Sequence, residues 1–181
     1  SVLPGIEDSL IGDFAAQAGA NQVGVKRLQE LVTKLGEANY QTAMIQLNEY
    51  ADRITSSVIT SLSPGTYSFE DVLDNDGIGN GPINLSVIIK ITEEAVALDF
   101  TGSSDQVPGN LNCPEAVVAA AAYYCFRCLM PGEVPACAGL FRRIKLRTRL
   151  GSVVNAKRPA AVTAGNVETS TRLVDVVFGA L

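Results

Sequence analysis

The sequence contains no histidine, and this absence excludes several kinds of site. Without an imidazole the chain cannot form a Ser-His or Cys-His nucleophile pair. It also contains no serine-elbow sequence and no phosphate-loop sequence. Acid–base chemistry carried by this chain alone would therefore depend on carboxylates, tyrosines or lysines.

Cysteine is also scarce, with four residues in 181. Cys125 and Cys128 form a Cys-x-x-Cys pair, while Cys113 and Cys137 stand apart. A structural zinc site usually takes four ligands from two such pairs on tight turns, whereas this pair lies in an apolar run typical of a buried helix. We therefore expect buried, reduced thiols and no metal ligand in this chain.

Long hydrophobic runs are missing as well. The most apolar stretch, Ala116 to Met130, is interrupted by Arg127 and is too short to cross a bilayer. No basic-apolar-small pattern opens the chain, so we expect a cytoplasmic protein without membrane contact. The acidic balance of 19 acidic against 14 basic residues argues against nucleic acid as a partner.

The composition and the two ends suggest an internal domain of a longer protein. Hydrophobic residues make up 47% and charged residues 18%, as expected for one folded domain over residues 1–181. The chain opens on Ser1 and closes on the apolar run Val174–Leu181, so we expect further chain on both sides. Apolar surface left exposed would permit self-association, which makes a homo-oligomer one partner that the sequence allows.

The first third of the sequence has helical periodicity. Apolar positions recur at three- and four-residue spacing up to Leu35, at Leu10, Phe14, Ala18, Val25, Leu28, Leu31 and Val32. Gly36 stands where a left-handed cap is expected, and a second helical segment covers about Glu37 to Leu62. Residues 1–63 are therefore predicted to form a helical hairpin.

The remaining residues, 64–181, have a mixed α/β pattern. Strand character over Thr66–Leu73, Ile83–Ile91 and Ala95–Thr101 predicts a small antiparallel sheet, with the turn-rich loop Asp74–Gly81 as a hairpin turn. This loop matches neither a calcium loop nor a dinucleotide-binding turn. A buried central helix over about Pro114–Met130, a strand over Phe141–Leu150 and a final helix from about Glu168 complete an α+β fold.

One predicted strand carries a row of cations. Residues 101–181 hold nine basic and five acidic residues, against five basic and 14 acidic in residues 1–100. Alternation places four cations on one face of the strand, namely Arg143, Lys145, Arg147 and Arg149. They could bind an anion or dock a partner, or they could form a solvated edge facing the acidic first half of the chain.

Two further segments place polar groups where chemistry is conceivable. Asp99 ends an apolar strand, where a carboxylate needs a partner, and it could instead hold the turn Thr101–Ser103. In Ala164–Ser170 the backbone N–H groups of a helix start could bind an anion. Asn166 as helix cap and Glu168 in the first turn would explain the same segment structurally.

Three blocks together resemble the hydantoinase B/oxoprolinase family. They are GDFAAQAGANQVGVKRLQELVTKLG at Gly12–Gly36, DFTGSSDQVPGNLN at Asp99–Asn112, and PAAVTAGNVETSTRLVDVVFGAL at Pro159–Leu181. The resemblance implies a cytosolic subunit whose hydantoinase A-type partner uses ATP and magnesium to activate a small cyclic amide. The B-type part then opens the ring or, in acetone and acetophenone carboxylase relatives, carboxylates a ketone.

The resemblance also implies which residues line a substrate site. The matching positions are Asn110, Asn112, Asn166, Glu168 and Thr169, and we add Asp99. The histidine- and aspartate-bearing segments that bind a divalent metal in the carboxylase relatives would precede this chain, so no metal ligand is carried over. Pro135–Gly139 departs from the family's usual Pro-x-Asn-x-Gly run by lacking its asparagine, which puts the substrate in doubt.

The leading hypothesis is that this domain is part of an ATP-dependent hydrolase that opens hydantoin or 5-oxoproline. The alternatives are a fragment of an acetone or acetophenone carboxylase-type enzyme, and a non-catalytic scaffold that docks subunits through its cationic strand. Catalytic residues are not assigned, and the 181 residues alone are expected to be inactive.

Overall fold

The computed structural model describes residues 6–181, and side chains from residue 11 onward, which leaves the side chain of Leu10 outside the described part. The chain divides into two compact units, of which the first runs to Gln46 and the second covers Leu47–Leu181. The assignment of residues 1–181 to one domain, with a division at residue 63, stays a prediction.

The first unit contains helix α1 (Ile6–Leu35) and the start of α2 (Glu37–Ser61). Gly36 separates the two helices with φ 81°, and its N–H donates to Val32 O over 2.8 Å, so the predicted cap is confirmed. Among the described side chains of the apolar stripe on α1, Val32 is half-buried, and the larger ones that are exposed are Phe14, Val25, Leu28, Leu31 and Leu35. The two predicted helices are therefore present, and the buried core formed by the described residues includes none of the described side chains of this stripe.

The second unit contains a four-stranded sheet in the order β1 (Gly65–Leu73), β2 (Ile83–Ile91), β3 (Val96–Asp99) and β4 (Ile144–Arg147). The first three strands form the predicted antiparallel meander. The fourth strand is parallel to β3, so the sheet is mixed rather than wholly antiparallel. The reason is the long connection through helix α3 (Glu115–Cys128), which returns the chain in the direction of β3.

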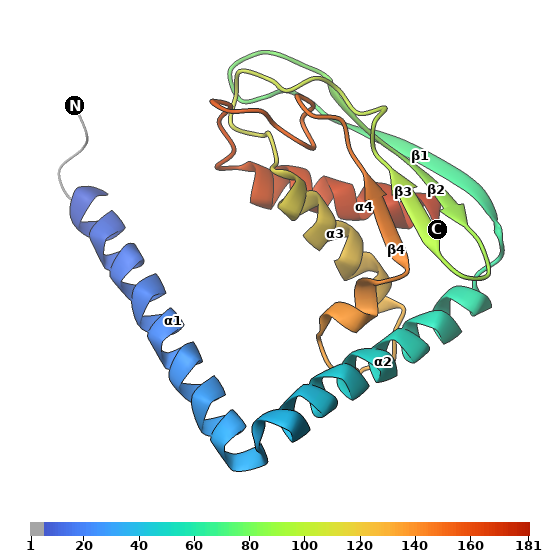
Figure 1. Ribbon diagram of the computed structural model, residues 1–181. Helices are drawn as coiled ribbons and strands as arrows, with labels where there is room; N and C mark the ends of the chain where they lie inside the picture. Colours follow the sequence, from blue (N-terminus) through green and yellow to red (C-terminus); the bar gives the residue numbers. More distant parts are fainter. Residues whose placement is uncertain (1–5) are drawn as a thin grey trace. The chain divides into compact units, whose positions relative to one another are not determined.

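Two helices lie on one side of this sheet (Figure 1). Helix α4 (Ser170–Ala180) packs against β1 and β2, and α3 packs against α4. Alternate residues of β2 are buried beneath them, namely Ile83, Leu85, Val87, Ile89 and Ile91. The opposite face keeps Ile88 and Lys90 exposed, so the strand has the period-two burial of a sheet with one covered face.

Several element boundaries differ from the predicted ones, and the largest change is that β4 covers Ile144–Arg147 instead of the predicted Phe141–Leu150. The strand predicted from Phe141 is preceded by a 3₁₀ turn at Ala138–Phe141, because Thr55 Oγ1 donates to Leu140 O over 2.9 Å and ties this segment to α2. The final helix is preceded by a π-helical turn, η2 (Gly165–Thr169), so α4 begins at Ser170 rather than near Glu168. Such π turns often occur at functional sites.

Within residues 6–181, no helix has both the length and the apolar character that a membrane span requires.

Candidate functional site

A polar cavity of about 410 Å³ opens where three segments of the second unit meet. The β1–β2 loop, the loop before α3 and the start of α4 all contribute to its wall. The lining residues are Val72, Leu73, Asp74, Asn75, Asp76, Gly77, Asn110, Leu111, Ala164, Glu168 and Arg172. Two of the predicted substrate-lining residues, Asn110 and Glu168, are thus brought to one cavity from positions 58 residues apart in the sequence.

Asp76 organises the β1–β2 side of the cavity. Its Oδ1 accepts the N–H groups of Ile78 (3.0 Å) and Asn80 (2.9 Å), and its Oδ2 accepts Asn80 Nδ2 (2.8 Å) and Gly109 N–H (3.0 Å). Burial by itself would raise the pKa of this carboxyl, but the four hydrogen bonds favour the charged form and lower the pKa to about 2. The buried group is therefore an ionised carboxylate at neutral pH, and it joins two loops.

Arg172 provides the cation of the cavity. Its Nη1 lies 2.7 Å from Asp71 Oδ2 and 3.7 Å from Asp175 Oδ2. The pKa of Asp71 is lowered, first by the hydrogen bond from Val72 N–H and then by this guanidinium. Because Asp71 lies on β1 and Arg172 on α4, the ion pair holds the guanidinium between the sheet and the helix.

Asn112 and Thr169 lie beneath the cavity wall rather than on it. The Asn112 side chain is fully buried, accepts Val107 N–H (2.8 Å) and donates to the carbonyls of Val107, Gly109 and Ala161 (2.9 Å each). The buried Thr169 hydroxyl donates to Leu111 O. Both residues therefore hold the loop that carries Asn110, and in this chain their polar groups are already engaged.

Asn166 points to a different surface from Glu168. It lines an apolar groove of about 610 Å³ between α3 and α4, together with residues such as Tyr124 and Val174. Among the described residues no side chain caps the π turn, so the predicted role of Asn166 as helix cap is wrong. Its carbonyl accepts the Ser170 hydroxyl over 2.7 Å instead. The groove is larger than the polar cavity, but it brings together fewer charged groups, so we take the polar cavity as the candidate site.

Asp99 lies on the sheet and outside the cavity. Its Oδ1 accepts the Thr101 N–H (2.9 Å) and hydroxyl (2.6 Å), so the turn-holding role considered from the sequence is present. Burial raises its pKa, but the Thr101 hydrogen bonds and the Arg147 guanidinium outweigh burial and lower it overall. The structure therefore places Asp99 away from Asn110 and Glu168.

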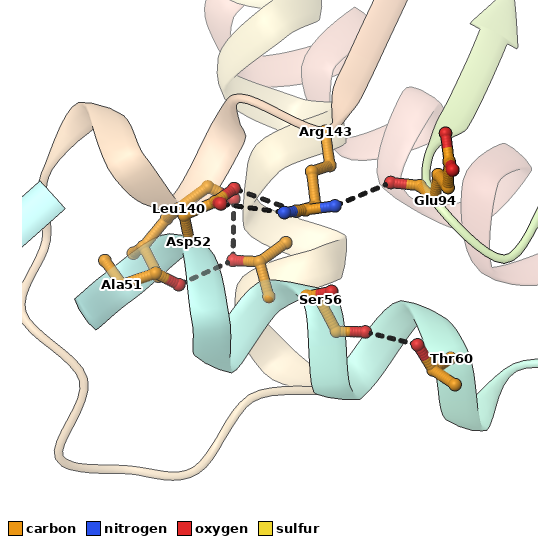
Figure 2. A network of polar contacts seen from close by, with 8 residues as sticks. Ala51, Asp52, Ser56, Thr60, Glu94, Leu140 and Arg143 are labelled. Atoms are coloured by element: carbon orange, nitrogen blue, oxygen red, sulfur yellow. Dashed lines mark hydrogen bonds and ion pairs between the residues drawn. The ribbon is translucent and has the colours of Figure 1, made fainter. Parts of the chain in front are cut away.

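Of the four cations predicted on one strand face, Lys145 and Arg147 lie within β4, whereas Arg143 and Arg149 lie just outside it, because the strand is shorter than predicted. Three of the four are paired within the chain. Arg143 binds Asp52 through Nε (2.9 Å) and Nη2 (2.8 Å) and also donates to Glu94 O (Figure 2). Arg147 lies 3.3 Å from Asp99, and Arg149 lies 2.7 Å from Asp105. Lys145 is exposed. Two of these acidic partners, Asp52 and Asp99, come from the acidic first half, as the charge distribution suggested.

The cysteines are all free. Cys113 and Cys125 are buried, and burial raises the pKa of each thiol to about 12. The expectation of burial is wrong for Cys128, which is exposed because it occupies the last turn of α3. Cys137 is half-buried.

Two residues of the site, Asp76 and Arg172, were not among the sequence candidates. Asp76 lies in a segment whose local pattern indicates only a hairpin turn, because its partner Gly109 is 33 residues away. The local signal was an acidic residue before Gly77 with Asn80 four positions on, which is typical of a side-chain-stabilised turn. Arg172 gave no local signal, since Asp71 is 101 residues away.

The sequence is similar to those of known enzymes and enzyme subunits. A family model described as Hydantoinase B/oxoprolinase matches residues 6–181. The chain is 36% identical to 5-oxoprolinase 1 of Arabidopsis thaliana, over 97% of this chain and 14% of that protein. It is 28% identical to a putative D-/L-hydantoinase subunit of Pseudomonas sp. strain NS671, over 95% of this chain and 31% of that protein.

A solved structure has the same fold. The ATP-dependent caprolactamase from Pseudomonas jessenii superposes with a TM-score of 0.81 at 25% sequence identity, covering 94% of this chain and 30% of that chain. The chain thus spans less than a third of the length of each of these three proteins.

Proposed function

This chain belongs to the hydantoinase B/oxoprolinase family, and we propose that it forms part of an ATP-dependent enzyme that hydrolyses the C–N bond of a cyclic amide. The names of its relatives support this proposal, because 5-oxoproline, hydantoins and caprolactam are all cyclic amides. The rest of the enzyme would come from chain beyond these residues. A hydantoinase A-type subunit or domain would handle ATP and magnesium, and the cytoplasmic location belongs to the same proposal.

The observation that carries the proposal for the site is the meeting of Asn110, Glu168 and Arg172 around one cavity. The amide group that is cleaved in a cyclic amide presents an N–H donor and a carbonyl acceptor. Glu168 is an exposed carboxylate that can accept the N–H, and the side-chain amide of Asn110 can donate to the carbonyl. Arg172, held by Asp71, adds a fixed positive charge next to an oxygen that gains negative charge during ring opening.

The described residues do not provide a site for the divalent metal that the resemblance implies for the parent protein. The chain has no histidine, and among the described residues no three Cys, Asp or Glu side chains are grouped so that they could hold a metal ion. We therefore assign no step through a metal to these residues. Their proposed role is to bind and orient the amide.

The test uses the full-length parent protein with its partner subunit, ATP and a panel of 5-oxoproline, hydantoin and caprolactam. Glu168→Gln should lower kcat/KM for the accepted amide by roughly tenfold, the scale of one lost charge-assisted hydrogen bond. Glu93→Gln, a change at an exposed carboxylate in the β2–β3 turn, serves as the matched control and should leave kcat/KM unchanged.

Two results would count against the proposal. If no cyclic amide stimulates ATP consumption, the hydrolase assignment is wrong. If ATP consumption instead requires bicarbonate and a ketone, the parent is a carboxylase. Equal kcat/KM values for Glu168→Gln and wild type would remove Glu168 from the site while leaving the family-level proposal intact.

A further inference from the structure

The buried carboxylate of Asp76 connects both walls of the candidate cavity. It accepts hydrogen bonds from its own loop, through Ile78 and Asn80, and from Gly109 in the loop before α3. Asp76 is only 1% exposed, so these four N–H groups replace the water that the carboxylate loses on folding.

The backbone geometry shows how closely the two loops approach each other. A Cβ atom on Gly109 would lie 2.1 Å from Asp76 O, which is far inside van der Waals contact. Within the β1–β2 loop, a Cβ on Gly81 would lie 2.3 Å from Asp74 O. Glycine at these two positions therefore allows the loops to come within hydrogen-bonding distance of the Asp76 side chain.

A path of three hydrogen bonds and the Gly109–Asn110 peptide link leads from Asp76 to both candidate ligand-binding residues. Gly109, whose N–H is held by Asp76, directly precedes Asn110. The carbonyl of Asn110 accepts the N–H of Ala164 over 3.0 Å, and the carbonyl of Ala164 accepts the N–H of Glu168 over 2.9 Å. The backbone of Asn110 is thus held on both sides, and the second contact starts the π turn that carries Glu168.

We propose that Asp76 is a positioning residue, whose hydrogen bond to Gly109 sets the placement of Asn110 and, through Ala164, of Glu168 for binding of the cyclic amide. This inference rests on the proposed function for the identity of the ligand. It assigns Asp76 a role in substrate affinity without contact between Asp76 and the substrate.

The main variant is Asp76→Asn in the full-length protein with its partner. Asparagine has nearly the same shape, but its amide turns two of the four accepted hydrogen bonds into donor–donor contacts whichever way it is oriented. KM for the cyclic amide should rise by roughly tenfold, while KM for ATP should change by less than about twofold. A KM for the amide equal to that of the wild type would overturn the proposal.

A matched control separates positioning from general destabilisation. Thr55→Val removes a buried hydrogen bond from Thr55 Oγ1 to Leu140 O, on residues that do not line the cavity. It should lower the free energy of unfolding and leave KM for the amide unchanged. If Thr55→Val raises this KM as much as Asp76→Asn does, the effect is one of stability and the positioning role is refuted.

A double substitution separates the Gly109 bond from the Asn80 side-chain bond. In Asp76→Asn/Asn80→Asp the donor and acceptor between the two side chains exchange places, but the amide nitrogen at position 76 then faces Gly109 N–H, because Oδ2 accepts both bonds in the wild type. KM of this double variant should therefore stay as high as that of Asp76→Asn, and recovery to the wild-type KM would count against the role of the Gly109 bond. If Asp76→Asn does not fold, Asn80→Ala removes the Asn80 Nδ2 bond alone and should raise KM by roughly threefold.

Amide hydrogen exchange tests the same path without any substrate. Asp76→Asn should speed exchange at Ala164 N–H, whose acceptor is Asn110 O, whereas Thr55→Val should not. Unchanged protection of Ala164 in Asp76→Asn would overturn the proposal. Since exchange does not depend on turnover, a failure of the proposed function and a failure of the positioning role remain distinguishable.

Discussion

The ion pair between Arg143 and Asp52 should contribute measurably to stability, in contrast to most surface pairs. Two nitrogens of Arg143 face the two carboxylate oxygens of Asp52 at 2.9 and 2.8 Å, and the side chains are only 31% and 20% exposed (Figure 2). The hydrogen bonds from Arg143 to the Asp52 carboxylate, and the negative charge of that carboxylate, raise the pKa of Arg143 above its usual value. Bidentate, half-buried pairs of this kind are the stronger class of ion pair.

The expected magnitude follows from the geometry. A hydrogen bond to a charged group contributes about 1.5–3 kcal/mol, and partial exposure of both side chains reduces this value. We therefore expect Arg143→Gln to lower the free energy of unfolding by about 1–2 kcal/mol, which corresponds to a Tm decrease of roughly 2–8 °C for a chain of this size.

A double-mutant cycle is the appropriate assay. Urea unfolding followed by far-UV circular dichroism would be measured for Arg143→Gln, Asp52→Asn and the double variant, giving the coupling energy of the pair. The control is the cycle for Arg147 and Asp99, which lie 3.3 Å apart with the arginine side chain 76% exposed. That coupling should be near zero, within about 0.5 kcal/mol. If the Arg143–Asp52 coupling is no larger than this control, the reasoning from geometry and burial is refuted.

Two further predictions concern titration and thiol reactivity. Since the pKa of Asp76 is lowered from 3.8 to about 2, its stabilising effect is complete above about pH 4 and is lost as the pH falls through about 2. The stability difference between wild type and Asp76→Asn in urea unfolding should therefore narrow over that interval, and a constant difference would contradict the assignment. In the native protein, a maleimide should label the exposed Cys128 well before the buried Cys113 and Cys125. Mass spectrometry of the labelled peptides would measure the three rates. Equal rates would contradict the burial of Cys113 and Cys125.

The pairing of Arg143 and Arg149 within the chain affects the scaffold hypothesis. Replacing all four cations by glutamine would break the Asp52 and Asp105 pairs as well as any contact with a partner. Lys145→Gln is the cleaner test of docking, because Lys145 is exposed on β4 and its loss breaks none of those pairs. Unchanged assembly of the parent complex with this variant would count against a docking role for the strand.

The sequence by itself determined the features that depend on local periodicity and local turn chemistry. The run of β-branched and other apolar residues from Ile83 to Ile91 predicted β2 at both ends, because such side chains favour a half-buried pleated strand. Gly36 predicted the break between α1 and α2, because a left-handed cap strongly favours glycine. The family blocks suggested Asn110 and Glu168 as substrate-lining residues; both line the polar cavity, and their contact with a substrate stays a prediction.

Only the tertiary structure decided the features that depend on partners far apart in the chain. The direction of β4 depended on the path through α3, and the role of Asp76 depended on Gly109. The position of Arg172 depended on Asp71, 101 residues away. Hydrogen bonds and ion pairs act over a few ångströms in space, whatever the separation of the two residues in sequence. A local sequence pattern can therefore indicate candidate residues for a site, but it cannot predict which of them are in contact.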